Sequence, residues 1–254
     1  MDMPPKQSLP DPASAYEDRY LAFVDILGFS NIILRSTGDP AIVERVYRAL
    51  AGISRKAGAA RSPHLGVQAT SFSDNVVISL PATGPGLFHL IGMINNFSQE
   101  LLSLGMLFRG AVVRGRALHT DEVVFGPALV DAYRLETSVS LHPRVMLSDQ
   151  VLSDATMYAG QAADRRSLAS RFIKEDVFDV PYLNLFADWE DDDTAWSSEA
   201  IAKLNLLRTL IHGGLIDNRR NPNVAEKYKW IARKLNAFIT ERRLGSRVEA
   251  IEFS

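Results

Sequence analysis

The chain has 254 residues, of which 46% are hydrophobic and 23% are charged, so it is long enough to bury a sizeable core. Its 28 Lys and Arg residues nearly balance its 30 Asp and Glu residues, which excludes a global basic field of the kind that attracts nucleic acid or a membrane surface. The absence of cysteine excludes disulfides and thiolate chemistry and fits a reducing compartment, so we expect a cytoplasmic protein.

Residues 1–17 are polar and rich in proline. They contain neither the basic segment nor the apolar segment of a signal peptide, so we interpret them as a flexible N-terminal arm. No run of about 18 apolar residues occurs in the sequence, and no membrane-spanning helix is therefore expected.

Residues 18–185 alternate between strand and helix patterns. Strands are predicted where apolar residues run together or alternate with polar ones, at 19–27, 65–72, 75–82, 106–120 and 122–125. Helices are predicted after Asp39-Pro40, over about 86–104, and from Gly126-Pro127 onward. Ser73 and Asp74 form the turn of a hairpin between the second and third strands.

The order strand, helix, strand, strand, helix, strand predicts an α+β fold of the ferredoxin-like type. In this fold a mainly antiparallel sheet is covered by helices on one face. Residues 186–254 differ in character, because an acidic loop that includes residues 190–193 is followed by two amphipathic helical patterns at 199–214 and 223–243. We interpret residues 186–254 as a C-terminal helical extension.

Two carboxylates stand out. Asp25 ends an apolar run just before the turn Gly28-Phe29-Ser30, and Asp74 lies in the expected hairpin turn. A buried carboxylate needs a basic partner or a metal ion, although either Asp alone is readily explained by hydrogen bonds within its own turn. In the ferredoxin-like order the two residues converge at one end of the sheet, and paired carboxylates suit one or two Mg²⁺ or Mn²⁺ ions. The glycine turn would supply backbone N–H groups for phosphate.

Three segments resemble the motifs of class III nucleotidyl cyclases. They are FVDILGFS (23–30), SFSDNVVISL (71–80) and FGPALVDAYRLE (125–136), and they occur in the order of that family. The resemblance covers about residues 18–185. It implies a cyclase catalytic domain, in which the 3′-oxygen of a nucleoside triphosphate attacks the α-phosphate and pyrophosphate is lost.

The resemblance also implies roles for individual residues. Asp25 and Asp74 would bind two Mg²⁺ or Mn²⁺ ions, with the backbone carbonyl of Ile26 as a further ligand. Arg134 corresponds to the arginine that stabilises charge developing on the α-phosphate, while a surface arginine in a helical ion pair is the plain alternative. Val130 replaces an asparagine of the third motif, which implies slower turnover or a different donor.

Two departures from the family concern the base. Thr70 and Val123 occupy the positions at which purine-specific members carry the residues that read the base. Neither side chain can make the expected purine contact. A site that hydrogen-bonds a base edge discriminates strongly, so these residues argue against ATP and GTP as preferred substrates.

Within the class III family, the chain is most similar to the pyrimidine cyclases of bacterial Pycsar anti-phage systems. The similarity lies in the undecorated domain, the strand RGAVVRG (109–115) and the helical C-terminus. It implies synthesis of cyclic UMP from UTP, or alternatively of cyclic CMP from CTP, as a signal that activates a separate effector protein. We expect UTP to be preferred.

Further substrate contacts are expected from residues outside the three motifs. Candidate contacts to the base or the phosphates are Tyr47, Arg109, Arg114 and Arg116. Strand alternation places Arg114 and Arg116 on one face and Arg109 on the other, so these arginines do not all serve one site. Phe29 is a candidate contact to the base, with core packing as its alternative. Lys174 is a candidate contact to the terminal phosphates, with a solvated surface charge as its alternative.

In the resembled family one subunit supplies the carboxylates and the other supplies the arginine. A homodimer with two composite sites is therefore expected. Two other functions stay open: a purine cyclase with different base-reading residues, and a degenerate cyclase-homology domain that senses nucleotides without turnover. Asp25, Asp74 and Arg134 count against the degenerate domain, whereas Val130 counts for it.

Overall fold

The computed structural model describes residues 15–59, 65–104, 106–139, 142–161, 163–176, 180–190 and 196–253. Its strands in chain order are β1 (Glu17–Ile26), β2 (Gln68–Phe72), β3 (Asn75–Pro81), β4 (Phe108–His119), β5 (Val124–Phe125), β6 (Val145–Leu147), β7 (Ile173–Glu175) and β8 (Pro181–Leu183). Its helices are α1 (Phe29–Ser36), α2 (Pro40–Ala59), α3 (Gly84–Ser103), α4 (Pro127–Val139), α5 (Asp149–Ala159), α6 (Ala163–Phe172), α7 (Ala187–Glu190), α8 (Ser198–Asp217) and α9 (Pro222–Glu241).

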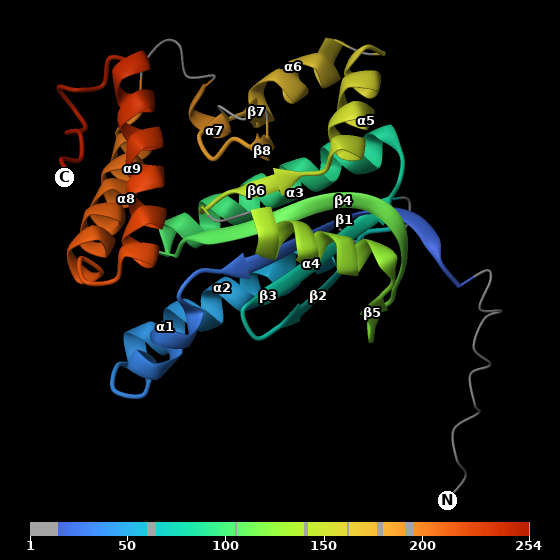
Figure 1. Ribbon diagram of the computed structural model, residues 1–254, viewed down its shortest axis with the longest axis horizontal. Coiled ribbons are helices and arrows are strands. Elements are labelled where there is room, and N and C mark those ends of the chain that lie inside the picture. The colour runs from blue at the N-terminus through green and yellow to red at the C-terminus, as the bar shows by residue number, and fades with distance from the viewer. Residues whose placement is uncertain are drawn as a thin grey trace, which may run out of the picture.

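The strands form one sheet with the order β2-β3-β1-β4-β6-β8-β7, and β5 pairs with β4 (Figure 1). Its first four strands pair antiparallel and have the ferredoxin-like order expected from the sequence. β6 adds to β4 in parallel. The predicted α+β fold with a mainly antiparallel sheet is therefore confirmed.

The two faces of β1 belong to two hydrophobic clusters, because successive side chains of a strand point to opposite faces. Tyr20 and Val24 lie in the main core with residues of α2 and α3, whereas Leu21 and Phe23 pack with Ala128 of α4. The expectation that the helices cover one face holds for α2 and α3 and is wrong for α4. Figure 1 shows α4 and α3 on opposite sides of β4 and β1.

The local predictions from the sequence agree well with the observed elements. Ser73 and Asp74 form the turn between β2 and β3, and Ser73 has the positive φ of 57° that tight hairpin turns favour. The helix expected from residue 86 begins two residues earlier, after Thr83, whose side chain accepts a hydrogen bond from the Gly86 N–H. α1 is a short separate helix that the sequence pattern did not distinguish from the turn before it.

The C-terminal helices pack against the domain through the main core. Leu207 and Ile211 of α8 and Ile231 and Leu235 of α9 belong to the same hydrophobic cluster as β1. Of the predicted acidic loop, residues 187–190 form the short helix α7 and residues 191–195 lie outside the described residues, as does most of the predicted N-terminal arm. Within the described ranges, no helix combines the length and apolar character needed to cross a bilayer.

Candidate active site

Asp25 lies near the end of β1, the strand between β3 and β4. Its register partners are Asn75 on β3 and Arg109 on β4. The next residue, Ile26, donates its N–H to the carbonyl of Asp74 over 3.1 Å. The hairpin turn therefore lies beside Asp25, and the two carboxylate residues meet at one end of the sheet, as the ferredoxin-like order predicts.

Arg109 joins Asp25 to a second carboxylate through the same guanidinium nitrogen. Its Nε lies 3.1 Å from Oδ2 of Asp25 and 2.5 Å from Oε1 of Glu136, a residue of α4. The side chain of Asp25 is 17% exposed and that of Glu136 is 2% exposed. One cation therefore serves two largely buried carboxylates, which leaves the cluster with an excess of negative charge.

The pKa values of both carboxyls reflect this excess. Burial raises the pKa of Asp25, Arg109 opposes the increase, and the nearby charge of Asp74 adds to it. Burial also raises the pKa of Glu136, again against the effect of Arg109. Lys227 of α9 lowers the pKa of both groups to a smaller extent. An additional cation beside Asp25 would therefore be favourable.

The turn that follows β1 has open space beside Gly28, which lines a cavity. Gly28 has φ of +74°, a conformation that glycine adopts without strain, and a Cβ at this position would meet no described atom within 4 Å. α1 begins at the next residue, and the N–H of Ile32 donates to the carbonyl of Gly28. The N–H groups at the start of α1 have no intrahelical acceptors, which is the property that lets a helix start bind phosphate.

The donors at this end of the sheet match a hard divalent cation. Asp25 and Asp74 would supply carboxylate oxygens, and Ile26, which follows Asp25 and donates its N–H to Asp74, has a backbone carbonyl as a further possible ligand. In the described part of the chain no group of three or more His, Cys, Asp or Glu side chains forms a closed metal site. Mg²⁺ and Mn²⁺ do not need one, because they keep several waters and are held by one or two carboxylates together with substrate phosphates.

Arg134 and Val130 lie on the exposed surface of α4. Glu136 is two residues after Arg134, and a helix turns by about 200° over two residues, so the two side chains point in opposite directions. The side chain of Arg134 makes no hydrogen bond or ion pair within the described residues. The structure therefore does not bring Arg134 to Asp25 of the same chain.

Thr70 and Val123, the two positions predicted to face the base, lie in different environments. Oγ1 of Thr70 is 3.1 Å from Nε2 of the buried His119, whose Nδ1 lies 2.8 Å from Oγ of Ser79. Val123, in the turn between β4 and β5, is 46% exposed. Neither position presents a charged or amide group for a purine.

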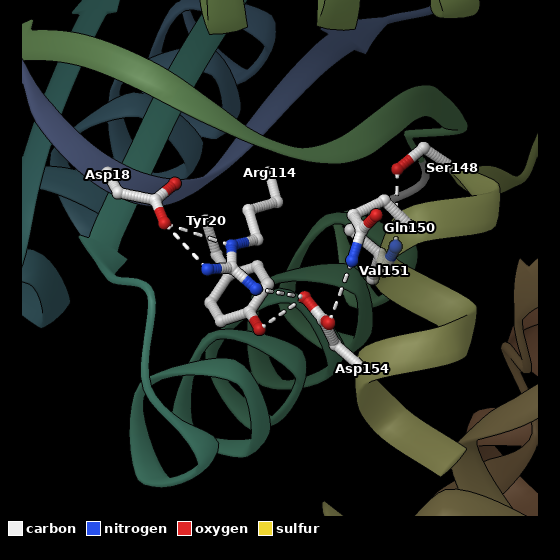
Figure 2. Close-up of polar contacts among 7 residues, drawn as sticks. All are labelled: Asp18, Tyr20, Arg114, Ser148, Gln150, Val151 and Asp154. Atoms are coloured by element: carbon white, nitrogen blue, oxygen red, sulfur yellow. Dashed lines mark hydrogen bonds and ion pairs between the residues drawn. The ribbon is translucent and has the colours of Figure 1, made fainter. Parts of the chain in front are cut away.

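Arg114 belongs to a polar network on β1, β4 and α5 (Figure 2). It donates to Asp18 and Asp154, and Asp154 also accepts from the hydroxyl of Tyr20 over 2.7 Å. Arg114 is five residues from Arg109 along β4, or about 17 Å in a strand. The structure therefore places Arg114 away from Asp25, in a contact that joins α5 to the sheet.

Three other candidates from the sequence lie in three different environments. Phe29 is buried in the main core, so packing explains its presence. Tyr47 is 67% exposed on α2. Lys174 is on β7, four strands from β1 in the sheet, and lines a separate cavity of about 250 Å³ with Tyr182.

Sequence reasoning did not identify Glu136 and Lys227 as members of the cluster. Glu136 is the last residue of the motif FGPALVDAYRLE, and its place in that motif could have indicated that it belongs to the site. Lys227 lies in a lysine-rich helix with no pattern that sets it apart from Lys229 or Lys234. Its proximity to Asp25 depends on how α9 packs.

Comparisons with known proteins find similarity among solved structures. The adenylyl cyclase CyaB from P. aeruginosa matches with a TM-score of 0.47 and 13% identity, over 66% of this chain and 94% of that chain. The guanylate cyclase domain of RhGC from Catenaria anguillulae, in complex with GTP, matches with a TM-score of 0.43 and 14% identity, over 55% of this chain and 82% of that chain. The guanylyl cyclase domain of RhoGC from Blastocladiella emersonii matches with a TM-score of 0.41 and 15% identity, over 66% of this chain and 95% of that chain.

A scan of family models and a search of curated proteins find no match. The function proposed below therefore rests on the side chains around Asp25 and on the motifs that surround them.

Proposed function

We propose that the protein is a metal-dependent nucleotidyl cyclase that converts UTP to 3′,5′-cyclic UMP and pyrophosphate. The observation that carries this proposal is the meeting of Asp25 and Asp74 beside the open turn at Gly28. It unites the first two cyclase-like motifs at one end of the sheet. The role in anti-phage defence, with a separate effector that responds to the cyclic nucleotide, rests on the resemblance to Pycsar cyclases.

Asp25, Asp74 and the carbonyl of Ile26 would hold two Mg²⁺ or Mn²⁺ ions. Bound ions would neutralise the triphosphate and make the 3′-hydroxyl more acidic. The other contributions come from the chain itself. The turn at Gly28 would orient the phosphates through its N–H groups, and Glu136 would retain its contact with Arg109 if Asp25 bound a metal ion.

The reaction forms a bond between the 3′-oxygen and the α-phosphorus and breaks the bond from that phosphorus to the bridging oxygen. The hydroxyl proton is lost, and the electron pair of the broken bond leaves with pyrophosphate. Arg134, exposed and without a partner in its own chain within the described residues, would reach the α-phosphate of a site in a second subunit. Val130 and Tyr133, exposed apolar residues within one turn of Arg134 on α4, support burial of this helix in a homodimer.

The preference for a pyrimidine rests on Thr70 and Val123. Thr70 is already hydrogen-bonded to His119, and Val123 has no polar side-chain atom. A purine would find no partner at these positions for its polar edge. UTP is favoured over CTP through the resemblance alone.

A second candidate function is a nucleotide sensor without turnover. The ion pair between Arg109 and Asp25 favours it, because it occupies one oxygen of a carboxylate that catalysis needs for metal.

One experiment separates these functions. The purified protein is incubated separately with ATP, GTP, CTP and UTP, with Mn²⁺ or with a chelator, and the products are resolved by chromatography, with Asp74→Ala as the control. Cyclic UMP and pyrophosphate that disappear with the chelator and in the variant would support the proposed enzyme. Cyclic CMP or a cyclic purine nucleotide would overturn the choice of base, and nucleotide binding without any product would favour the sensor.

A further inference from the structure

A cavity lies between the turn after β1 and the C-terminal helices. Its volume is about 620 Å³. Leu27, Gly28 and Ile32 line one side, and Gly213 of α8 and Lys227 of α9 line the other. Figure 1 shows the α8–α9 pair standing at the end of the sheet where β1 leads into α1. The extension therefore forms a wall beside the residues of the proposed catalytic site.

Lys227 is the residue of this wall that interacts with the carboxylate cluster. Burial lowers the pKa of its amine and Arg109 lowers it further, while Asp25 and Glu136 raise it. Lys227 lines the same cavity as Leu27 and Gly28, which follow Asp25 in the chain, so α9 borders the turn after β1. In the described residues it makes no hydrogen bond or ion pair, so its three N–H donors are available to a ligand.

With Lys227 included, the charged side chains that line the cavity carry a net positive charge. Arg45 of α2 lines the cavity and, like Lys227, makes no hydrogen bond or ion pair with a described residue. Asp217, at the end of α8, is the one carboxylate among the lining residues. Two cations therefore oppose one anion in the lining. The glycine turn and Ile32 of α1 line the same cavity as Lys227, and the start of α1 adds backbone N–H groups.

We propose that α8 and α9 form part of the catalytic cavity of their own chain, and that Lys227 binds the phosphate chain of the nucleotide. This inference rests on the proposed function, since it concerns the same site. Phosphates that share metal ions with Asp25 must lie beside that residue, which is where Lys227 is available. A lysine on a flexible stem is suited to this contact, because its charge can follow a phosphate chain that changes position as pyrophosphate leaves.

Two variants test the contact and the cavity separately. Lys227→Gln removes the charge and keeps most of the side chain. Gly213→Leu adds bulk to the cavity wall at a position where a Cβ meets no described atom within 4 Å, and leucine favours a helix more than glycine does. The matched controls are Lys229→Gln, on the same helix but lining a different cavity, and Gly213→Ala.

The measurement is calorimetric binding of inorganic tripolyphosphate with Mg²⁺, together with KM and kcat for UTP. Lys227→Gln and Gly213→Leu should each weaken binding about 10-fold or more and raise KM, with melting temperatures equal to or above that of the wild type. Lys227→Arg should restore most of the affinity, and both controls should bind as the wild type does.

The outcomes distinguish this inference from the function on which it rests. If the wild type turns over UTP and both test variants bind tripolyphosphate normally, the proposed role of the extension in binding phosphate is wrong, and the proposed cyclase activity is retained. If the wild type neither binds tripolyphosphate nor turns over any nucleotide, the proposed function is wrong, and this inference fails with it.

Discussion

In the cross-strand pair between β1 and β4, Nε of Arg109 donates a hydrogen bond of 3.1 Å to Oδ2 of Asp25. The carboxylate that interrupts the apolar first strand therefore has a basic partner before any metal ion is considered. Because the same Nε also contacts Glu136, the positive charge is shared, and neither carboxylate is fully neutralised. The shared contact with Arg109 lets the fold bury both carboxylates, and the remaining negative charge still favours an added cation.

Replacement of Arg109 by methionine should destabilise the protein by about 3–5 kcal/mol, because two largely buried carboxylates would lose their common partner. Urea unfolding at pH 7 measures this loss. The loss should shrink as the pH falls toward 5, because carboxyls with raised folded-state pKa values bind protons more readily in the folded state.

Arg48→Met is the matched control for Arg109→Met. Arg48 pairs with Glu44 on the exposed surface of α2, and exposed helical pairs contribute about 0.5 kcal/mol or less. Equal losses for the two variants would show that the Arg109 cluster contributes no more than a surface pair.

Mn²⁺ should raise the melting temperature of the wild type and leave those of Asp25→Asn and Asp74→Asn unchanged. At about 100 times its dissociation constant, a ligand specific for the folded state stabilises it by about 2.7 kcal/mol. Differential scanning fluorimetry across a Mn²⁺ titration gives the readout. Asp164→Asn, a carboxylate in the first turn of α6, is the control and should respond as the wild type does. A response that survives both test substitutions would place the ions elsewhere.

Mixing Asp25→Ala with Arg134→Ala should restore activity that neither variant has alone. In the proposed homodimer, a mixed dimer has one site in which both residues are intact, so random pairing of equal amounts gives about a quarter of wild-type turnover. Turnover of UTP measured over a range of mixing ratios tests this. If no ratio restores activity, the two residues do not act in a shared site.

The sequence predicted the parts of the site that depend on local patterns and on strand order. The turn at Asp74 follows from hairpin chemistry, and its position beside Asp25 follows from the ferredoxin-like order. The contact between Arg109 and Glu136 depends on the position of α4, which covers the opposite face through the small residues Ala128 and Ala132. A helix whose buried stripe is made of alanine has a weak periodic signal, so its face was not predicted.

The candidate residues that lie away from Asp25 show the same limit of local sequence patterns. The sequence around Arg114 is compatible with a phosphate contact, but its guanidinium is paired with Asp154, a residue 40 positions later in α5. Lys174 and Lys227 are equally ordinary lysines in sequence. Lys174 is far from Asp25 because of the order of the strands beyond β4, and Lys227 is near it because of the way α9 packs. Such long-range pairings have no local signature.

Tyr20→Phe should cost about 1–2 kcal/mol in unfolding free energy. The buried hydroxyl donates to Asp154, and hydrogen bonds to charged groups contribute about 1.5–3 kcal/mol, part of which is retained because Arg114 and Gln150 still donate to the same carboxylate (Figure 2). Turnover should stay unchanged. Tyr158→Phe on α5 is the control, with an expected change below about 0.5 kcal/mol. A fall in kcat without a loss of stability would instead connect this network to the site.

His119 should make the protein less stable in acid. Burial lowers its pKa to about 4, with a further contribution from the charge of Arg19. The unfolded state then binds the proton more readily, so stability is complete above about pH 6.5 and falls as the pH drops from there to 4, by at most about 3 kcal/mol. Urea unfolding across this range measures the slope. His119→Gln, which can keep the hydrogen bonds to Thr70 and Ser79 but does not titrate, should flatten it. An unchanged slope in that variant would assign the acid sensitivity to the carboxylates.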